Sequence, residues 1–294
     1  MDRRKNKVAI CINFILFITL IILWSNVFII QGLTGAISWS LLKLVFAPIG
    51  LVLLDMFFVL LIIEILKRKN VLNRIISVIL SIILAFPILM LTNIVPIKYP
   101  SNLKTSSPAV VIKSPFKEEV VVGWGGDKLK DNSPHAIWPS ERWAYDLVMN
   151  PYDIGSDNLE DYGIYNKEIF SPVAGEIIEV YDKEKDIKPN TEEFEYMEGN
   201  HIYIRIDDTQ TFLLLNHLKE NSVKVKVGDH VKVGDLLGRV GNSGSTSEPH
   251  LHIHHQKQDP TKTIYPVFAE GLPLYFYNEN NKLIMPTRGS SIKK

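Results

Sequence analysis

Three long apolar stretches dominate the first hundred residues. Residues 8–30 and 75–97 carry no charged side chain, and residues 44–66 carry only Asp55 and Glu64. An α-helix rises about 1.5 Å per residue, so roughly 20 apolar residues are enough to cross a bilayer. The first stretch is too long for the apolar core of a cleaved signal peptide, and no clear small-residue cleavage site follows it. The pattern predicts an all-α membrane segment, residues 1–98, with helices at 8–30, 44–66 and 75–97.

The hydrophobic pattern changes beyond this segment. Residues 99–118 are rich in Ser, Pro and Lys without a period, which predicts a linker. Short runs of β-branched, aromatic and alternating residues then follow, separated by turn residues. These runs cover residues 120–122, 143–149, 175–181, 201–206, 211–215 and 251–255. They predict an all-β, antiparallel domain at residues 119–279, with a C-terminal tail at 280–294.

The charges are distributed unevenly along the chain. The formal net charge is +0, but residues 1–100 carry 10 basic and 3 acidic side chains. Basic residues precede the first apolar stretch and separate the second from the third, whereas residues 31–40 are uncharged. Positive charge marks cytoplasmic loops. We therefore expect a multi-pass protein of the cell membrane, embedded in the lipid bilayer through three helices, with a cytoplasmic N-terminus and an extracytoplasmic C-terminal domain.

Composition excludes some classes of protein. A single cysteine, Cys11, excludes an internal disulfide framework. No domain is strongly basic, so nucleic acid is not an expected partner. The sequence leaves the oligomeric state open.

All eight histidines lie in the C-terminal part, and four segments there could carry chemistry. In Pro249-His250-Leu251-His252, alternation along a strand places His250 and His252 on one face, about 7 Å apart. Two such imidazoles can reach one metal ion or one water. His217 follows another predicted strand, Asp146 lies on a third, and a turn-rich stretch covers residues 238–244. We expect His201 to face solvent or pack, and His230 and His255 to lie at the surface, all without a role.

In this order and spacing, these segments resemble the lysostaphin or LytM-type zinc metallopeptidases, which cut peptide cross-links in bacterial cell walls. That family has an H-x-x-x-D motif, a mid-chain His-Leu, a V-x-x-G-D/Q-x-x-G-x-x-G-x-S/T-G stretch and a terminal H-x-H. The matching segments, over about residues 119–255, are Asp146, His217-Leu218, Gly234–Gly244 and His250–His252. The resemblance, which leaves out the membrane segment, implies an antiparallel LytM-like sheet, a Zn2+ cofactor and a peptidoglycan peptide substrate.

The resemblance also implies roles for individual residues. Asp146 and His252 would bind zinc. His217 and His250 would flank the attacking water, one as general base and the other stabilising the developing charge. No H-E-x-x-H motif is present, so a glutamate base of that type is not expected.

One position departs from the family pattern. The family's first zinc ligand, four residues before the Asp, is replaced here by Arg142. A guanidinium stays protonated and has no lone pair to donate, whereas a catalytic zinc site needs three protein ligands. We expect His135, in Asn132-Ser-Pro-His135, to be the third ligand, as a branch of the family with a similar segment suggests. His254, on the strand face of His252, is the alternative, and a site without a third ligand is also open. Arg142 is expected to hold Asp146 through a charge-assisted bond.

Three functions are compatible with these features. The first is a membrane-anchored zinc metalloendopeptidase, a hydrolase of peptide bonds in bacterial peptidoglycan. The second, favoured by Arg142, is a catalytically eroded LytM-like domain that binds cell-wall peptide or regulates a partner hydrolase. The third is a phosphocarrier or lipoyl-like β domain, suggested by the Gly-Asp turns of residues 225–238. That third function needs a cytoplasmic domain, so the expected topology argues against it.

Overall fold

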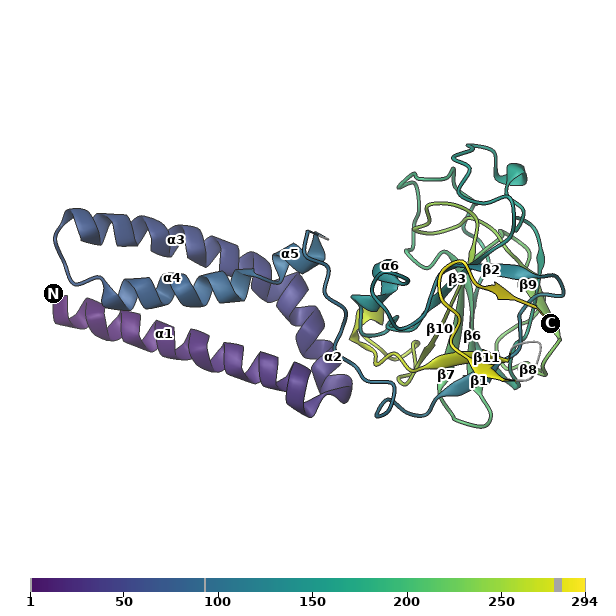
Figure 1. Cartoon of the computed structure of the whole chain (residues 1–294), viewed down its shortest axis with the longest axis horizontal. Helices are drawn as coiled ribbons and strands as arrows, with labels where there is room; N and C mark the ends of the chain where they lie inside the picture. The colour runs from purple at the N-terminus through teal and green to yellow at the C-terminus, as the bar shows by residue number, and fades with distance from the viewer. Residues whose placement is uncertain (1, 93, 278–281, 294) are drawn as a thin grey trace. The chain divides into compact units, whose positions relative to one another are not determined.

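The computed structural model describes residues 2–92, 94–277 and 282–293. Figure 1 shows its two units, which are Met1–Pro100, built from helices, and Ser101–Lys294, built mainly from strands. Each unit has its own apolar core. The three apolar helices and the antiparallel β domain expected from the sequence are therefore both present.

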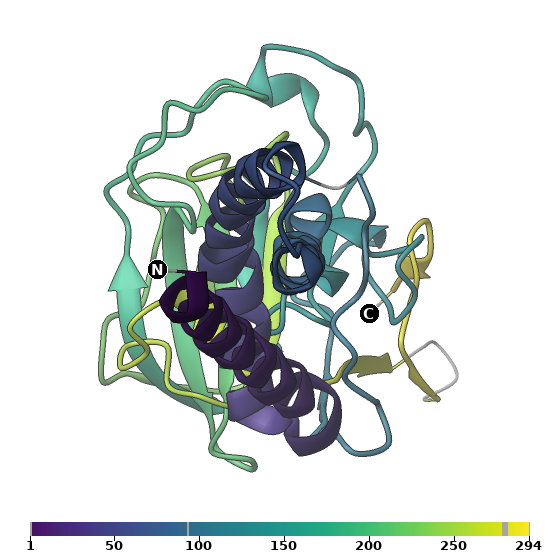
Figure 2. The ribbon, with the colours of Figure 1, turned by 90° about the vertical axis from the view of Figure 1, so that its left-hand side faces the viewer.

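The first unit is helical along all three apolar stretches. Three helical segments are long and apolar enough to cross a membrane: Lys7–Ile30, Gly32–Leu66 and Leu72–Leu91. They consist of α1 (Asp2–Ser25), the π-helical turn η1 (Asn26–Ile30), α2 (Gly32–Leu41), the π-helical turn η2 (Leu42–Phe46), α3 (Ala47–Leu66), α4 (Leu72–Ala85) and α5 (Ile88–Leu91). Figures 1 and 2 show α4 beside α1 and α3, and it packs against both.

The helix boundaries differ from the predicted ones at two points. The second helical segment begins at Gly32 rather than at 44, because the uncharged stretch before it is itself helical. The third ends at Leu91 rather than at 97, and a turn at Phe86 and Pro87 separates α4 from α5. Proline has no backbone N–H and its ring clashes with the preceding helical turn, which accounts for the break.

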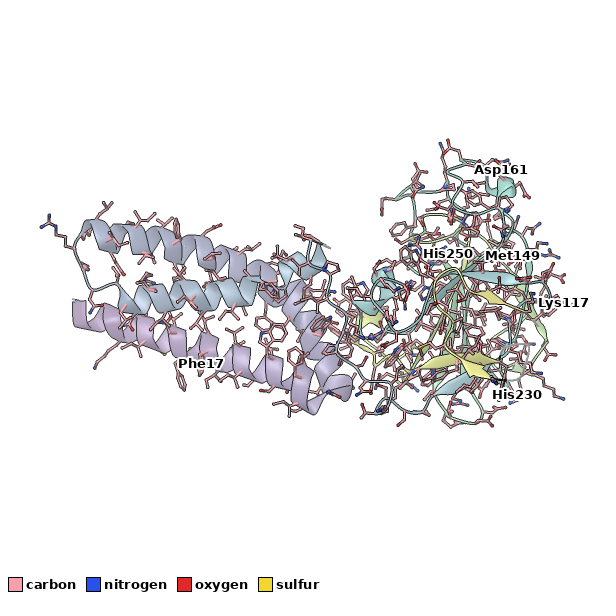
Figure 3. All side chains as sticks on the ribbon, viewed as in Figure 1. Phe17, Lys117, Met149, Asp161, His230 and His250 are labelled. Atoms are coloured by element: carbon pink, nitrogen blue, oxygen red, sulfur yellow. The ribbon has the colours of Figure 1, made fainter. Side chains whose placement is uncertain are left out.

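The outer surface of this unit is apolar, while polar side chains inside it are paired. Phe17 is 50% exposed and points away from the other helices in Figure 3. Inside, Asn13 Nδ2 donates to the Asn73 carbonyl at 2.8 Å, and Ser77 Oγ donates to Asn13 Oδ1 at 2.7 Å. Lipid offers no hydrogen-bond partner, so polar groups among spanning helices bond to each other. These features support membrane association.

The second unit is built around one eight-stranded antiparallel sheet, with strand order β13-β2-β3-β10-β7-β6-β5-β8. Two small sheets, β1-β11-β12 and β4-β9, complete it. The strands are β1 (Val110–Ile112), β2 (Val120–Trp124), β3 (Tyr145–Val148), β4 (Glu168–Phe170), β5 (Gly175–Tyr181), β6 (Asn200–Ile206), β7 (Phe212–Leu218), β8 (His230–Val231), β9 (Leu236–Arg239), β10 (Leu251–Gln256), β11 (Leu274–Tyr277), β12 (Leu283–Ile284) and β13 (Ser291–Ile292). Short helical turns are α6 (Ser133–Ala136), η3 (Leu159–Asp161) and η4 (Pro266–Phe268).

Three strands lie in segments for which the sequence predicted no structure. β1 falls inside the expected linker, 99–118, and pairs in parallel with β11. Its Val110 and Ile112 are buried in the domain core, which explains why this short stretch is extended. β12 and β13 fall in the expected tail, 280–294; β12 pairs with β11, and β13 pairs with β2. The expected boundary at 279–280 lies outside the described residues.

Strand alternation gives the large sheet two different faces. Tyr145, Leu147, Leu215, Leu251 and Ile253 belong to the main apolar core on one face. The residues between them point to the other face, because successive side chains of a strand alternate. That second face carries the polar side chains of the candidate site.

Candidate metal centre

The centre begins with two adjacent strands of the large sheet. In the register of β3 and β10, Asp146 is directly opposite His252. Asp146 Oδ1 lies 3.0 Å from His252 Nδ1, and both side chains are buried. On its other side, His252 is opposite Asn216 of β7.

His135 reaches the same carboxylate from the short helical turn α6. Its Nε2 lies 3.3 Å from Asp146 Oδ2. Its Nδ1 lies 2.8 Å from Asn132 Oδ1. The Asn132 amide nitrogen donates to the carbonyls of Gly126 and Ala144, each at 3.2 Å. This fixes Oδ1 as the acceptor, so His135 Nδ1 carries the proton that it donates and Nε2 faces Asp146.

His217 and His250 form a second pair beside the first group, with ring centroids 4.8 Å apart. His217 Nδ1 donates to the Ser243 carbonyl at 2.8 Å, and His250 Nδ1 donates to the Glu248 carbonyl at 2.7 Å. A carbonyl can only accept a hydrogen bond. Each neutral ring therefore has its proton on Nδ1 and a lone pair on Nε2.

The Gly-rich turn of the sequence motif supports His217. Gly199 and Gly244 approach so closely that a Cβ on Gly199 would lie 2.4 Å from the Ser243 carbonyl carbon. This approach needs residues without side chains, and both glycines have a positive φ. His217 itself has φ 64°, rare for a side-chain-bearing residue, and bonds from its N–H to Glu198 O and from Gly241 N–H to its carbonyl hold it there.

The charges of the group shift the ionisation of its members. Burial raises the pKa of Asp146, but the charges of His135 and His250 outweigh it and hold that pKa well below its usual range. Burial lowers the pKa of His135, but the Asp146 carboxylate outweighs it, so the pKa is above its usual value. Burial, reinforced by His250 and His252, holds the pKa of His217 well below its usual range. Burial also lowers the pKa of His250, although Asp146 opposes it.

Two overlapping groups of these residues have the spacing of a metal site. The donor atoms of His135, Asp146 and His252 lie within 4.8 Å of one another, as do those of His217, His250 and His252. Imidazole nitrogen and carboxylate oxygen are zinc ligands, and three protein ligands with one open position form a catalytic zinc site. The first group offers that number, so the residues fit a zinc ion. The second group places two further imidazoles beside it.

Two expectations about neighbouring residues need correction. Arg142 was expected to bond to Asp146, but its buried guanidinium pairs with Asp127 Oδ1 at 2.6 Å. The Trp143 indole N–H donates to the same oxygen at 3.0 Å. His255 was expected at the surface, but it is 1% exposed, with Nε2 2.6 Å from Thr211 Oγ1.

The remaining histidines are placed as follows. His254, the alternative third ligand, lies behind His252 and outside both candidate groups, with its Nδ1 3.0 Å from His252 Nε2. His201 stacks on Tyr203. Figure 3 shows His250 within the β domain and the exposed His230 at its periphery. Sequence reasoning assigned no role to Gln256, although alternation along β10 places it on the face of His252 and His254.

A comparison with known protein families matches the segment that holds three of the site histidines. Residues 161–263 match the family model of peptidase family M23. That segment of the chain is therefore similar to an M23 peptidase domain. The matched segment contains His217, His250 and His252, whereas His135 and Asp146 precede it. The role of those two residues therefore rests on the geometry of the site.

Proteins similar to this chain include an endolysin and peptidases of known structure. The endolysin 2638A of Staphylococcus phage 2638A is 26% identical over 140 residues, which cover 45% of this chain and 29% of that protein. The lysostaphin catalytic domain from Staphylococcus simulans is 21% identical, with a TM-score of 0.31, over 52% of this chain and 86% of that one. A zinc-containing peptidase from Vibrio cholerae is 22% identical, with a TM-score of 0.26, over 38% and 26% of the chains. The chain thus spans less than a third of the endolysin.

Proposed function

We propose that this protein is a membrane-anchored zinc endopeptidase that hydrolyses peptide bonds of bacterial peptidoglycan. One observation carries the proposal: the ligand group His135, Asp146 and His252 lies against two imidazoles, His217 and His250, whose Nε2 atoms are unprotonated. The similarity to peptidase family M23 supports the reaction class.

His135, Asp146 and His252 would hold the ion, and the two flanking imidazoles would handle protons. A bound zinc ion polarises the scissile carbonyl and makes a water more acidic. Nε2 of either His217 or His250 can accept the proton that the attacking water loses, and the resulting imidazolium keeps its Nδ1–H bond to a backbone carbonyl. As the C–N bond breaks, that proton passes to the leaving nitrogen. The other imidazole stabilises the charge on the former carbonyl oxygen.

The substrate class and location extend this proposal. The resemblance to lysostaphin-type enzymes favours peptides of the cell wall, and the related endolysin is consistent with such a target. Three helices able to cross a membrane precede the domain. The distribution of basic residues around them favours an extracytoplasmic domain, which is where the wall lies.

The first test is zinc content and cleavage by the purified full-length chain. We expect about one zinc per chain. Mass spectrometry of digested peptidoglycan should detect new peptide amino termini and no new reducing ends of the glycan strands. His217→Ala is the matched control, because it should keep zinc and lose cleavage. A folded wild-type chain without zinc or cleavage would reject the proposal.

A second candidate is a domain that binds wall peptide without cutting it. Arg142, at the position of the family's first His ligand, is the observation that favours it. In the structure Arg142 pairs with Asp127, and three imidazoles approach Asp146 instead. Zinc-free protein that still sediments with insoluble peptidoglycan would favour this second candidate.

The proposed orientation has its own test. Protease added to intact cells should remove the domain that follows Pro100 and leave the helical unit in the membrane. Complete protection of the domain in intact cells, with digestion after lysis, would reverse the orientation.

A further inference from the structure

Strand β10 carries two more buried polar side chains on the face of His252. His252 Nε2 lies 3.0 Å from His254 Nδ1, and His254 Nε2 lies 3.2 Å from Gln256 Oε1. Gln256 Nε2 donates to the Gln258 carbonyl at 2.7 Å. His252, His254 and Gln256 are each at most 5% exposed. They form a continuous hydrogen-bond chain along one strand that begins at a proposed zinc ligand.

The donors and acceptors of these hydrogen bonds can be assigned in only one way. The Gln258 carbonyl can only accept, so Gln256 donates to it and turns Oε1 towards His254. Oε1 can also only accept, so His254 carries a proton on Nε2. Nδ1 of a neutral His254 is then an acceptor, and His252 donates to it from Nε2. The backbone carbonyl at the far end thus determines the protonation of a ring three links away.

We propose that His254 and Gln256 are positioning residues that keep the proton of His252 on Nε2 and so present its Nδ1 lone pair to the zinc position. This inference rests on the proposed function, because it assigns Nδ1 of His252 as the ligand atom. Nδ1 is the nitrogen that faces Asp146 Oδ1, at 3.0 Å. A ligand imidazole is oriented, and its tautomer set, by the bond at its other nitrogen.

The proposed ligand His135 is held by the same kind of device. Its Nδ1 donates to the Asn132 side-chain amide, and its Nε2 faces Asp146. Each imidazole ligand is therefore anchored, directly or through His254, to a side-chain amide whose own N–H groups bond to backbone carbonyls. His135 is anchored at Nδ1 and so offers Nε2, whereas His252 is anchored at Nε2 and so offers Nδ1.

The direction of the bonds can be measured without zinc. Nitrogen-15 NMR of the full-length chain in detergent, labelled at histidine, distinguishes protonated from bare ring nitrogens. We expect His254 to be protonated on Nε2 alone, and His252 to be protonated on Nε2 both with and without zinc. A His254 proton on Nδ1 would overturn the inference.

The effect on the metal is tested by zinc affinity, measured with a competing chelator on the full-length chain. His254→Leu removes the acceptor and should weaken zinc binding about 10- to 100-fold, as loss of a ligand's hydrogen-bond partner typically does. His254→Gln restores an acceptor and a donor, and should recover most of that loss. His255→Leu is the matched control, since it removes a neighbouring buried imidazole from the opposite face and should leave zinc affinity unchanged.

The outcomes separate this inference from the proposed function. If the wild-type chain binds no zinc, the proposed function fails, while the NMR measurement still decides the direction of the bonds. If the wild-type chain binds zinc and a folded His254→Leu variant binds it equally well, the proposed function stands and the positioning role is wrong. Circular dichroism and the unfolding midpoint of each variant establish that it is folded.

Discussion

The two faces of strand β10 are both buried but differ in chemistry. Leu251 and Ile253 lie in the apolar core and are 0% exposed. His252, His254 and Gln256, on the other face, are almost as buried and are connected by hydrogen bonds. Burying polar groups costs free energy unless each finds a partner, whereas apolar burial stabilises directly. The comparison shows that one strand can stabilise the fold with one face and contribute to the candidate metal centre with the other.

Substitution of the polar histidines of the proposed site should have the largest effects. His252→Ala should abolish both zinc binding and cleavage, because it removes a ligand of the proposed site. His217→Ala should keep zinc but lower the cleavage rate by about 10²- to 10⁴-fold, the usual contribution of a proton-transfer group. Zinc content and peptide release from purified peptidoglycan would measure the two effects. Full activity of His217→Ala would show that its assigned role is wrong.

The third ligand is the next largest test of the polar face. His135→Ala should weaken zinc binding much more than His254→Ala, because His135 faces Asp146 directly, whereas His254 contacts the ligand group only through His252. Chelator competition on both variants would measure the difference. The reverse order would move the third ligand to strand β10.

A substitution on the apolar face should lower the unfolding free energy of the domain and leave metal binding unchanged. Ile253→Ala leaves a cavity in the main core, and such substitutions cost about 2–5 kcal/mol of unfolding free energy. Denaturant unfolding would measure that loss, while the folded fraction should still bind zinc as the wild type does. An unchanged unfolding free energy would mean that this face does not stabilise the domain as described.

His255, the one imidazole of β10 on the core side, sharpens the comparison through pH. Burial lowers its pKa to about 4. The unfolded chain therefore takes up the proton first as pH falls below about 6.5, and stability present at neutral pH is lost towards pH 4. Between pH 7 and pH 5 this group should cost about 2 kcal/mol of unfolding free energy. His255→Leu should reduce the acid sensitivity by that amount in unfolding curves recorded at both pH values; equal sensitivity would contradict the assignment.

The sequence predicted the fold class and strand β10 well because both depend on local patterns. The three apolar stretches and the alternating runs can be recognised in the sequence without any knowledge of tertiary contacts. The pairing of β1 with β11 could not be read in this way, because Val110 meets Leu274 from the far end of the chain. A three-residue strand within a polar, Pro-containing segment has too weak a pattern to be distinguished from a linker.

The site was predictable to the extent that its residues share a strand. His250 and His252 follow from alternation along one strand. The placement of His135 beside Asp146 needed the family resemblance, because His135 lies on the short turn α6 and the segment between α6 and β3 has no regular period. The partner of Arg142 was missed because Asp127 lies in a loop, where spacing does not indicate contact. The direction of the His252–Gln256 bonds depends on the Gln258 carbonyl, whose position only the folded chain reveals.

During synthesis, β1 leaves the ribosome long before its neighbour exists. Val110 pairs with Leu274, so β1 must wait, at about 5–20 residues per second, on the order of ten seconds or more for β11 to be made. An unpaired strand edge is a template for pairing with other chains. A nascent chain stalled in this interval would display a completed membrane unit followed by an open edge. The synthesis of β11 therefore determines when the edge of β1 is covered and no longer available to other chains.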